Sequence, residues 1–183
     1  MRALRLVLVL ASVLLLGAAE VHGADAKLDP LFERLQAARD SAEAKQVEAL
    51  IWQGWLQGGG SAATSLMELG VGAMAAGNLP AALGIFDAIV KQSPDYAEGW
   101  NKRATVLFLM GALDKSAEDV DQVLKLEPRH FGALAGLGMI RAQQDRTEEA
   151  IAAFERALAV HPNLDQVRRN LDILKKKRRD GAI

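Results

Sequence analysis

Apolar residues recur at steps of three and four along most of the chain, which is the pattern of amphipathic helices. Between positions 63 and 162 these stretches come in pairs, and each pair is separated from the next by turn residues. Prolines at positions 94, 128 and 162 end successive pairs, and the interval between them is constant. Such a regular interval predicts a chain built from a repeated helix pair.

Side chains of similar size align when the chain is compared with itself at the interval of the prolines. A large residue recurs in the first helix of each unit, and small residues recur where the two helices of a pair must approach closely. A further bulky residue recurs in the second helix, where it fills the gap to the next unit. The aligned sets are Leu66, Trp100 and Leu134; Gly70, Ala104 and Gly138; Ala82, Ser116 and Ala150; and Phe86, Val120 and Phe154.

The ends of the helices are also marked in the sequence. Gly111 supplies a turn between the two helices of the middle unit, and Gly77 and Asp145 hold the equivalent positions in its neighbours. Asp95 is placed to cap the first helix of the middle unit, with Glu98 three residues later in the spacing of a capping box.

This pattern resembles the tetratricopeptide repeat, whose signature places Trp, Leu-Gly, Tyr, Ala, Phe, Ala and Pro along about 34 residues. Three copies are expected, at 63–96, 97–130 and 131–162. The resemblance implies an all-α fold, a solenoid of antiparallel helix pairs with an N-terminal helical hairpin and a C-terminal capping helix. The signature is most regular in the third copy, at Leu134, Leu137, Gly138, Ala150, Phe154, Ala157 and Pro162.

Residues 27–60 carry two apolar stripes without the repeat signature, and they predict a helical hairpin followed by a glycine-rich hinge. The hairpin is close to one period in length, so we expect it to pack as a degenerate first repeat. The alternative is that it folds back or clasps a partner. Trp52 and Trp55 are interpreted as core residues.

Residues 163–183 predict a capping helix and a basic tail. Leu164, Val167, Leu171 and Leu174 form one apolar stripe, and the other side of this helix is charged, as a terminal cap requires. The tail from Lys175 to Arg179 is either a solvated helix end, favoured by the helix dipole, or a contact for acidic lipid or an acidic protein.

Residues 1–23 are typical of a secretory signal peptide. Two arginines precede an apolar run, Leu6–Ala19, and small residues offer cleavage sites after Gly23 or Ala26. The run is short for a membrane span, which needs about 20 residues, so an uncleaved anchor is the second interpretation. The mature protein is expected to be exported, and periplasmic if the source is bacterial.

The sequence offers little chemistry to an enzyme. It has no cysteine and three histidines, and it lacks His-Glu-x-x-His, phosphate-loop and Gly-x-Ser-x-Gly motifs. We therefore predict no catalysis, no cofactor and no metal site. The net charge of −1 gives no indication of nucleic-acid binding.

The resemblance implies that the first helix of each repeat lines a concave groove. Asn101 is a candidate to bond a peptide backbone and Lys102 to meet a carboxylate. The alternative is that these side chains pack against the hairpin or cap and close the groove. The family's carboxylate clamp for chaperone tails is disfavoured, because Met67 and Val71 occupy its positions. The candidate binding residues are Met67, Val71, Met74, Glu98, Asn101, Lys102, Thr105, Phe108 and Met139.

Arg103 stands where the repeat has an apolar residue, so its half-buried charge needs a partner. Glu68 and Glu98 are the candidate partners. The hypothesis is that Arg103 ties the first two copies together, and the alternative is a role in ligand binding. The sequence favours an adaptor or scaffold that binds a protein or peptide segment, in a cell-envelope complex. The alternatives are a self-assembling structural subunit and, from a third class, a small ligand carrier or enzyme.

Overall fold

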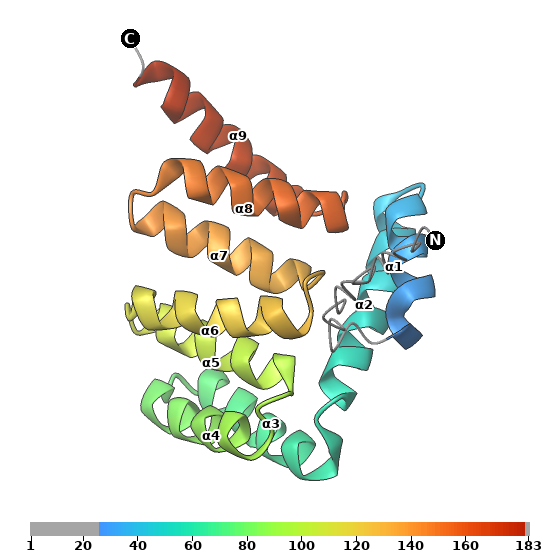
Figure 1. The fold of residues 1–183 in the computed structure, drawn as a ribbon, viewed down its shortest axis with the longest axis vertical. Coiled ribbons are helices and arrows are strands. Elements are labelled where there is room, and N and C mark those ends of the chain that lie inside the picture. The colour runs from blue at the N-terminus through green and yellow to red at the C-terminus, as the bar shows by residue number, and fades with distance from the viewer. Residues whose placement is uncertain (1–25, 182–183) are drawn as a thin grey trace, which may run out of the picture.

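The structure, a computed structural model, describes residues 26–181, and every regular element within that range is helical. The predicted all-α fold class is therefore confirmed, while the predicted signal segment lies outside the described residues. The elements, shown in Figure 1, are η1 (Ala26–Leu28), α1 (Asp29–Ala37), α2 (Ser41–Gln57), α3 (Gly60–Ala75), α4 (Leu79–Gln92), α5 (Ala97–Leu109), α6 (Leu113–Leu126), α7 (Phe131–Gln143), α8 (Thr147–Val160) and α9 (Asp165–Asp180).

Helices α3 to α8 form three antiparallel pairs stacked in one direction (Figure 1). The turn inside each pair uses the left-handed backbone conformation, with φ of 73° at Gly77, 77° at Gly111 and 58° at Asp145. Glycine adopts this conformation without steric cost, and aspartate tolerates it better than most residues do. The constant period of the sequence thus reflects the same turn made three times.

The columns of small residues arise from close contact between the two helices of a pair. A Cβ atom added to Gly70 would lie 2.6 Å from the ring of Phe86, and one added to Gly138 would overlap the ring of Phe154. Each phenylalanine therefore packs directly on the backbone of the preceding helix. In the middle pair the contact is polar, because Ser116 Oγ donates a 2.7 Å hydrogen bond to the carbonyl oxygen of Ala104.

Helix α9 begins one full period after α7 and takes the place of the first helix of a fourth unit. Its apolar side, with Val167 and Leu171 buried, packs with α7 and α8 as a cap. Part of the basic tail pairs with the preceding unit rather than standing free. The ion pairs are Lys175 with Glu155 at 2.7 Å, Arg178 with Glu148 at 3.1 Å, and Lys177 with Asp145 at 3.7 Å.

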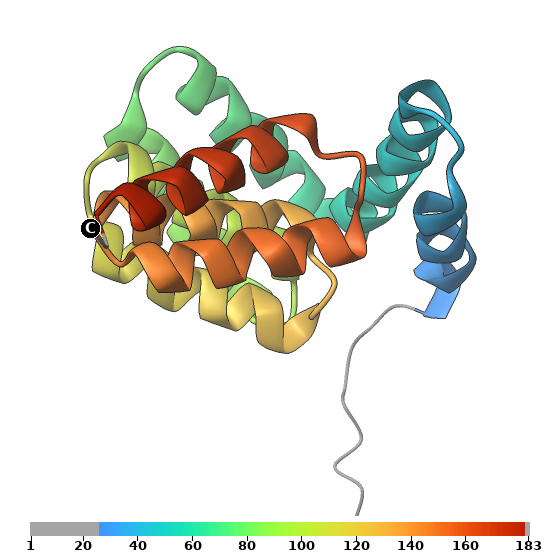
Figure 2. The same ribbon diagram turned by 90° about the horizontal axis from the view of Figure 1, so that it is seen from above.

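The hairpin of α1 and α2 does not stack on α3 as a degenerate repeat, so that expectation was wrong. Figures 1 and 2 show α2 running across one edge of the solenoid, roughly perpendicular to the paired helices. This edge consists of the loops that precede α5, α7 and α9. The chain redirects at Gly60, whose φ of 72° is open to glycine but not to most other residues.

Three successive loops supply the contacts that hold α2 in this position. The Tyr96 hydroxyl donates a 2.9 Å hydrogen bond to the carbonyl oxygen of Leu56. One unit later the ring of Trp55 stacks on His130, with centroids 3.9 Å apart and planes at 7°. Near the middle of α2, Glu48 accepts a 3.2 Å hydrogen bond from His161 Nε2.

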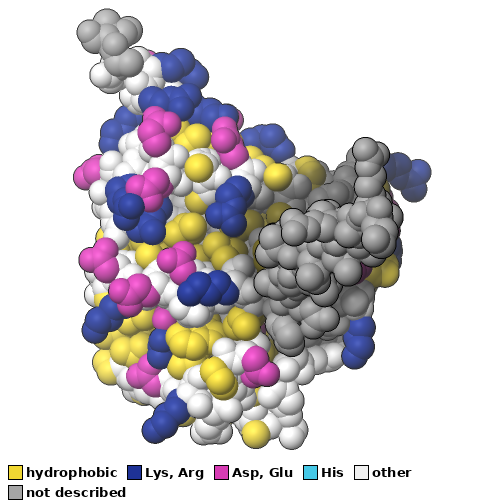
Figure 3. Space-filling view, viewed as in Figure 1, with side chains coloured by type: hydrophobic (Ala, Val, Ile, Leu, Met, Phe, Trp, Pro, Cys, Tyr) yellow, Lys and Arg dark blue, Asp and Glu magenta, His cyan; other side chains and the backbone are white. Residues whose placement is uncertain are grey.

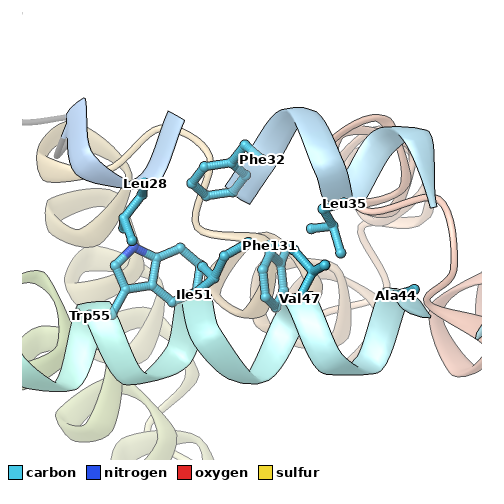
Figure 4. Packing of buried hydrophobic residues seen from close by; sticks show 8 residues of the cluster. All are labelled: Leu28, Phe32, Leu35, Ala44, Val47, Ile51, Trp55 and Phe131. Carbon is cyan, nitrogen blue, oxygen red and sulfur yellow. The ribbon is translucent and has the colours of Figure 1, made fainter. Parts of the chain in front are cut away.

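An apolar cluster joins the hairpin to the third unit. Phe131, the first residue of α7, inserts among the side chains of α1 and α2 (Figure 4). Arg129 covers this cluster from the same loop, with its guanidinium 4.1 Å from the ring of Phe32 and 2.7 Å from Asp29. The hairpin is thus fixed to the repeats, and Trp55 is a core residue as predicted. The buried members are Leu28, Phe32, Leu35, Ala44, Val47, Ile51, Trp55 and Phe131.

Candidate functional site

The first helices of the four units, α3, α5, α7 and α9, lie on one side of the stack, and we call their outward surface the first-helix face. The sequence placed nine candidate binding residues on it. Three of them are exposed, three are half-buried and three are buried. The exposed ones are Val71, Thr105 and Met139; the half-buried ones are Met74, Lys102 and Phe108; the buried ones are Met67, Glu98 and Asn101.

A small apolar pocket opens on this face between α5 and α7. Its volume is about 50 Å³, and α6 forms its floor through Ser116 and Val120. This volume is large enough for part of one aliphatic side chain and too apolar to hold water well. Four of the nine candidates line the pocket together, namely Asn101, Thr105, Phe108 and Met139.

Glu98 does not belong to the exposed surface, contrary to the sequence prediction, because its side chain is fully buried. Its Oε2 accepts hydrogen bonds from His130 Nε2 at 3.0 Å and from Asn101 Nδ2 at 2.9 Å. The Lys102 ammonium lies 2.9 Å from its other oxygen. Asn101 and Lys102 are therefore engaged within the fold rather than free for a ligand.

The predicted capping box at the start of α5 is also absent. The helix begins after Tyr96, which makes no side-chain cap, and Glu98 turns inward to the loop before α7 instead. The His130 ring explains this preference. Its Nδ1 accepts the backbone N–H of Ala133 at 3.1 Å, so its Nε2 carries the proton and donates to Glu98.

The environment of Glu98 favours the charged carboxylate. Burial alone raises the pKa of Glu98, but the hydrogen bond from His130 and the positive charge of Lys102 outweigh it, and the pKa lies below its ordinary value. A buried charge with this many partners is a structural link between α5 and α7.

A second histidine forms a similar link to the hairpin. Glu48 accepts hydrogen bonds from His161 Nε2 at 3.2 Å and from Trp52 Nε1 at 3.3 Å. The bond from His161 is the main reason that the pKa of Glu48 is lowered. In the sequence, each histidine lies within two residues of a repeat-ending proline. Their partners Glu98 and Glu48 are 32 and 113 residues away, so the sequence alone did not identify these pairs.

Arg103 points away from the first-helix face. Its guanidinium makes two 2.7 Å hydrogen bonds to Asp119 and one of 2.9 Å to Asp87, and it lies 4.8 Å from the ring of Trp100. The predicted partners Glu68 and Glu98 were wrong, but Arg103 does tie the first two copies together, because Asp87 belongs to α4. Figure 3 shows the face of α4, α6 and α8, where basic, acidic and hydrophobic side chains are interspersed.

Stacked antiparallel helix pairs with a constant period define an α-solenoid built of repeats. The family model of the tetratricopeptide repeat matches residues 67–120 and 101–165, and the chain belongs to this family. None of the helices within residues 26–181 is both long enough and apolar enough to span a membrane.

Two curated relatives show how far the similarity extends. A TPR repeat-containing protein of Rhizobium etli is 38% identical over 136 residues, which cover 74% of this chain and 67% of that protein. DnaJ homolog subfamily C member 3 of Homo sapiens is 32% identical over 97 residues, which cover 53% of this chain. The match spans only 19% of the human protein's length.

Solved structures show the same fold at low sequence identity. The Sgt2 TPR domain from Aspergillus fumigatus superimposes with a TM-score of 0.64 at 22% identity, covering 67% of this chain and 83% of that one. The first TPR of Spaghetti (RPAP3), bound to the HSP90 peptide SRMEEVD, gives 0.61 at 21% identity, covering 63% and 91%.

Proposed function

We propose that this protein is a non-catalytic adaptor that binds a segment of another protein on its first-helix face. The observation that carries the proposal is the apolar pocket between α5 and α7, bordered by the exposed Thr105 and Met139. The hairpin is held at the edge of the repeats by Tyr96, His130 and His161, so it does not occupy this pocket.

Similar structures support this type of binding. The RPAP3 domain holds an HSP90 peptide, and the Yersinia enterocolitica chaperone SycD, with a TM-score of 0.60, holds a peptide of the translocator YopD. The proposed partner is not a chaperone tail. Met67 and Val71 offer no positive charge to the terminal carboxylate of such a tail, and Lys102 is paired with Glu98.

The proposed place of action is outside the cytosol, in a complex of the cell envelope. The basic start and short apolar run of residues 1–23 support export, and the absence of cysteine suits a periplasmic protein of a bacterium. Lys176 and Arg179 are the tail residues available for acidic lipid or protein, because the neighbouring cations form ion pairs with the third unit.

A photo-crosslinking amino acid at Thr105, introduced in cells of the source organism, tests this function. We expect one dominant foreign protein in the crosslinked product, identified by mass spectrometry, because Thr105 borders the pocket. The same group at Lys125, an exposed residue of α6, is the control and should not capture that protein. Crosslinks from Thr105 only to this chain's own residues would contradict the proposal.

A further inference from the structure

One exposed position of the first-helix face repeats with the period of the helix pairs. Val71, Thr105, Met139 and Ile173 hold it, one on each of α3, α5, α7 and α9. The three apolar members expose 43%, 44% and 64% of their surface. A single exposed apolar side chain is ordinary, but core packing gives no reason for one to recur at the same position of successive units. We call these four residues the apolar row.

The spacing of the apolar row matches an extended peptide. Contacting helices lie roughly 8–10 Å apart, and α5 contacts both α3 and α7. A polyproline helix advances about 3.1 Å per residue with three residues per turn, so every third side chain points to the same side and would meet the next member of the row. A flat strand would not do so, because its side chains alternate between two sides. The pocket beside Thr105 and Met139 would receive a side chain at the middle of the segment.

The two ends of the row differ in charge. On α9, Arg169 and Lys176 lie four residues before and three after Ile173, so the three share one side of the helix. Arg169 bonds only the neutral amide of Gln166, and Lys176 has no ion pair within residues 26–181. At the other end, Glu68 lies three residues before Val71 and is exposed. Asp172 shares this side of α9, so the two cations leave a net positive charge there, whereas the face is negative at α3.

We infer that the ligand of the first-helix face is a segment in the polyproline conformation with an apolar side chain at every third position and an acidic side chain at the end that lies over α9. This inference rests on the proposed function and specifies the chemistry of the bound segment. The apolar row supplies the contact area, and the charges of α9 set the direction in which the segment lies.

A synthetic peptide tests the inference on the purified chain lacking residues 1–23. The probe is a fluorescent peptide of about ten residues with leucine at every third position, serine and glycine between, and two glutamates at one end. Fluorescence anisotropy should show saturable binding. A peptide of the same composition with its leucines adjacent should bind about tenfold more weakly, a difference of about 1.4 kcal/mol.

Two matched variants locate the binding site. Met139→Glu should weaken the probe at least about tenfold, whereas Leu69→Glu, on an exposed residue of α3 outside the row, should leave binding unchanged. Lys176→Glu should weaken the glutamate-ended probe and strengthen a lysine-ended one. Circular dichroism of each variant, matching that of the wild type, shows that the fold is kept.

Equal binding of the two leucine arrangements, or equal effects of Met139→Glu and Leu69→Glu, would overturn the inference. If no peptide binds while the crosslinker at Thr105 still captures a foreign protein, the inference is wrong and the proposed function stands. If the crosslinker also captures nothing, both are wrong.

Discussion

Replacing Glu98 by alanine should lower the free energy of unfolding by about 3–5 kcal/mol. The substitution leaves the Nε2 proton of His130 and the amide of Asn101 without their shared acceptor in the interior, and it removes the counter-ion of Lys102. It also loosens the His130 ring, on which Trp55 stacks, and so weakens the attachment of the hairpin to the repeats. Urea unfolding followed by circular dichroism measures the change.

The control is Glu68→Ala, an exposed carboxylate on α3, which should change stability by less than about 0.5 kcal/mol. The pH dependence of the free energy of unfolding is a second test of the role of Glu98. Because the pKa of Glu98 lies below the ordinary glutamate value of 4.5, its ionised form stabilises the fold above that value, and this stabilisation is lost as the pH falls through the lower, folded pKa. An equal loss for both variants would contradict a structural role for Glu98.

Replacing Trp55 by alanine should also cost about 3–5 kcal/mol, the usual range for removing a large aromatic side chain from a core. Trp55 contacts Phe32, Phe131 and the ring of His130, so its loss opens a cavity where the hairpin meets the third unit. We expect α1 and α2 to become sensitive to protease while the repeats remain folded at low denaturant.

Leu56→Ala, one residue further along the same helix, is the matched control. Leu56 is partly exposed and lies outside the buried cluster, so its truncation should cost less than about 1 kcal/mol. A cost for Trp55→Ala as small as that of the control would show that the hairpin is not held at the edge of the solenoid.

The repeats were predictable because their pattern is local and occurs three times. Gly77, Gly111 and Asp145 mark the turns in the sequence, and the structure confirms a left-handed residue at each. The position of the hairpin was not predictable in this way. Its amphipathic pattern showed that α2 buries one side, but not that this side meets loops around Tyr96 and His130, far away in the sequence.

The positions of some candidate residues were predictable for the same reason. Position within the repeat predicted that Thr105 and Met139 lie on the first-helix face, and the structure has both exposed there, but it did not predict the pocket between them. Position alone could not show that Glu98 turns inward, because the cause is His130, 32 residues away. Arg103 shows the same limit, since the need for an acidic partner was evident but the choice of Asp119 depends on the angle between α5 and α6.

The rate at which hydrogen peroxide oxidises each methionine measures directly whether the first-helix face is open. Methionine sulfoxide forms fastest where the sulfur is reached by solvent. Met139 on this face is 44% exposed, Met110 outside the pocket is 46% exposed, and Met67 in the core is 4% exposed. We predict that mass spectrometry of the purified mature chain finds Met139 oxidised as fast as Met110 and much faster than Met67. Protection of Met139 to the level of Met67 would show that another part of the chain covers the face, and would contradict an open binding surface.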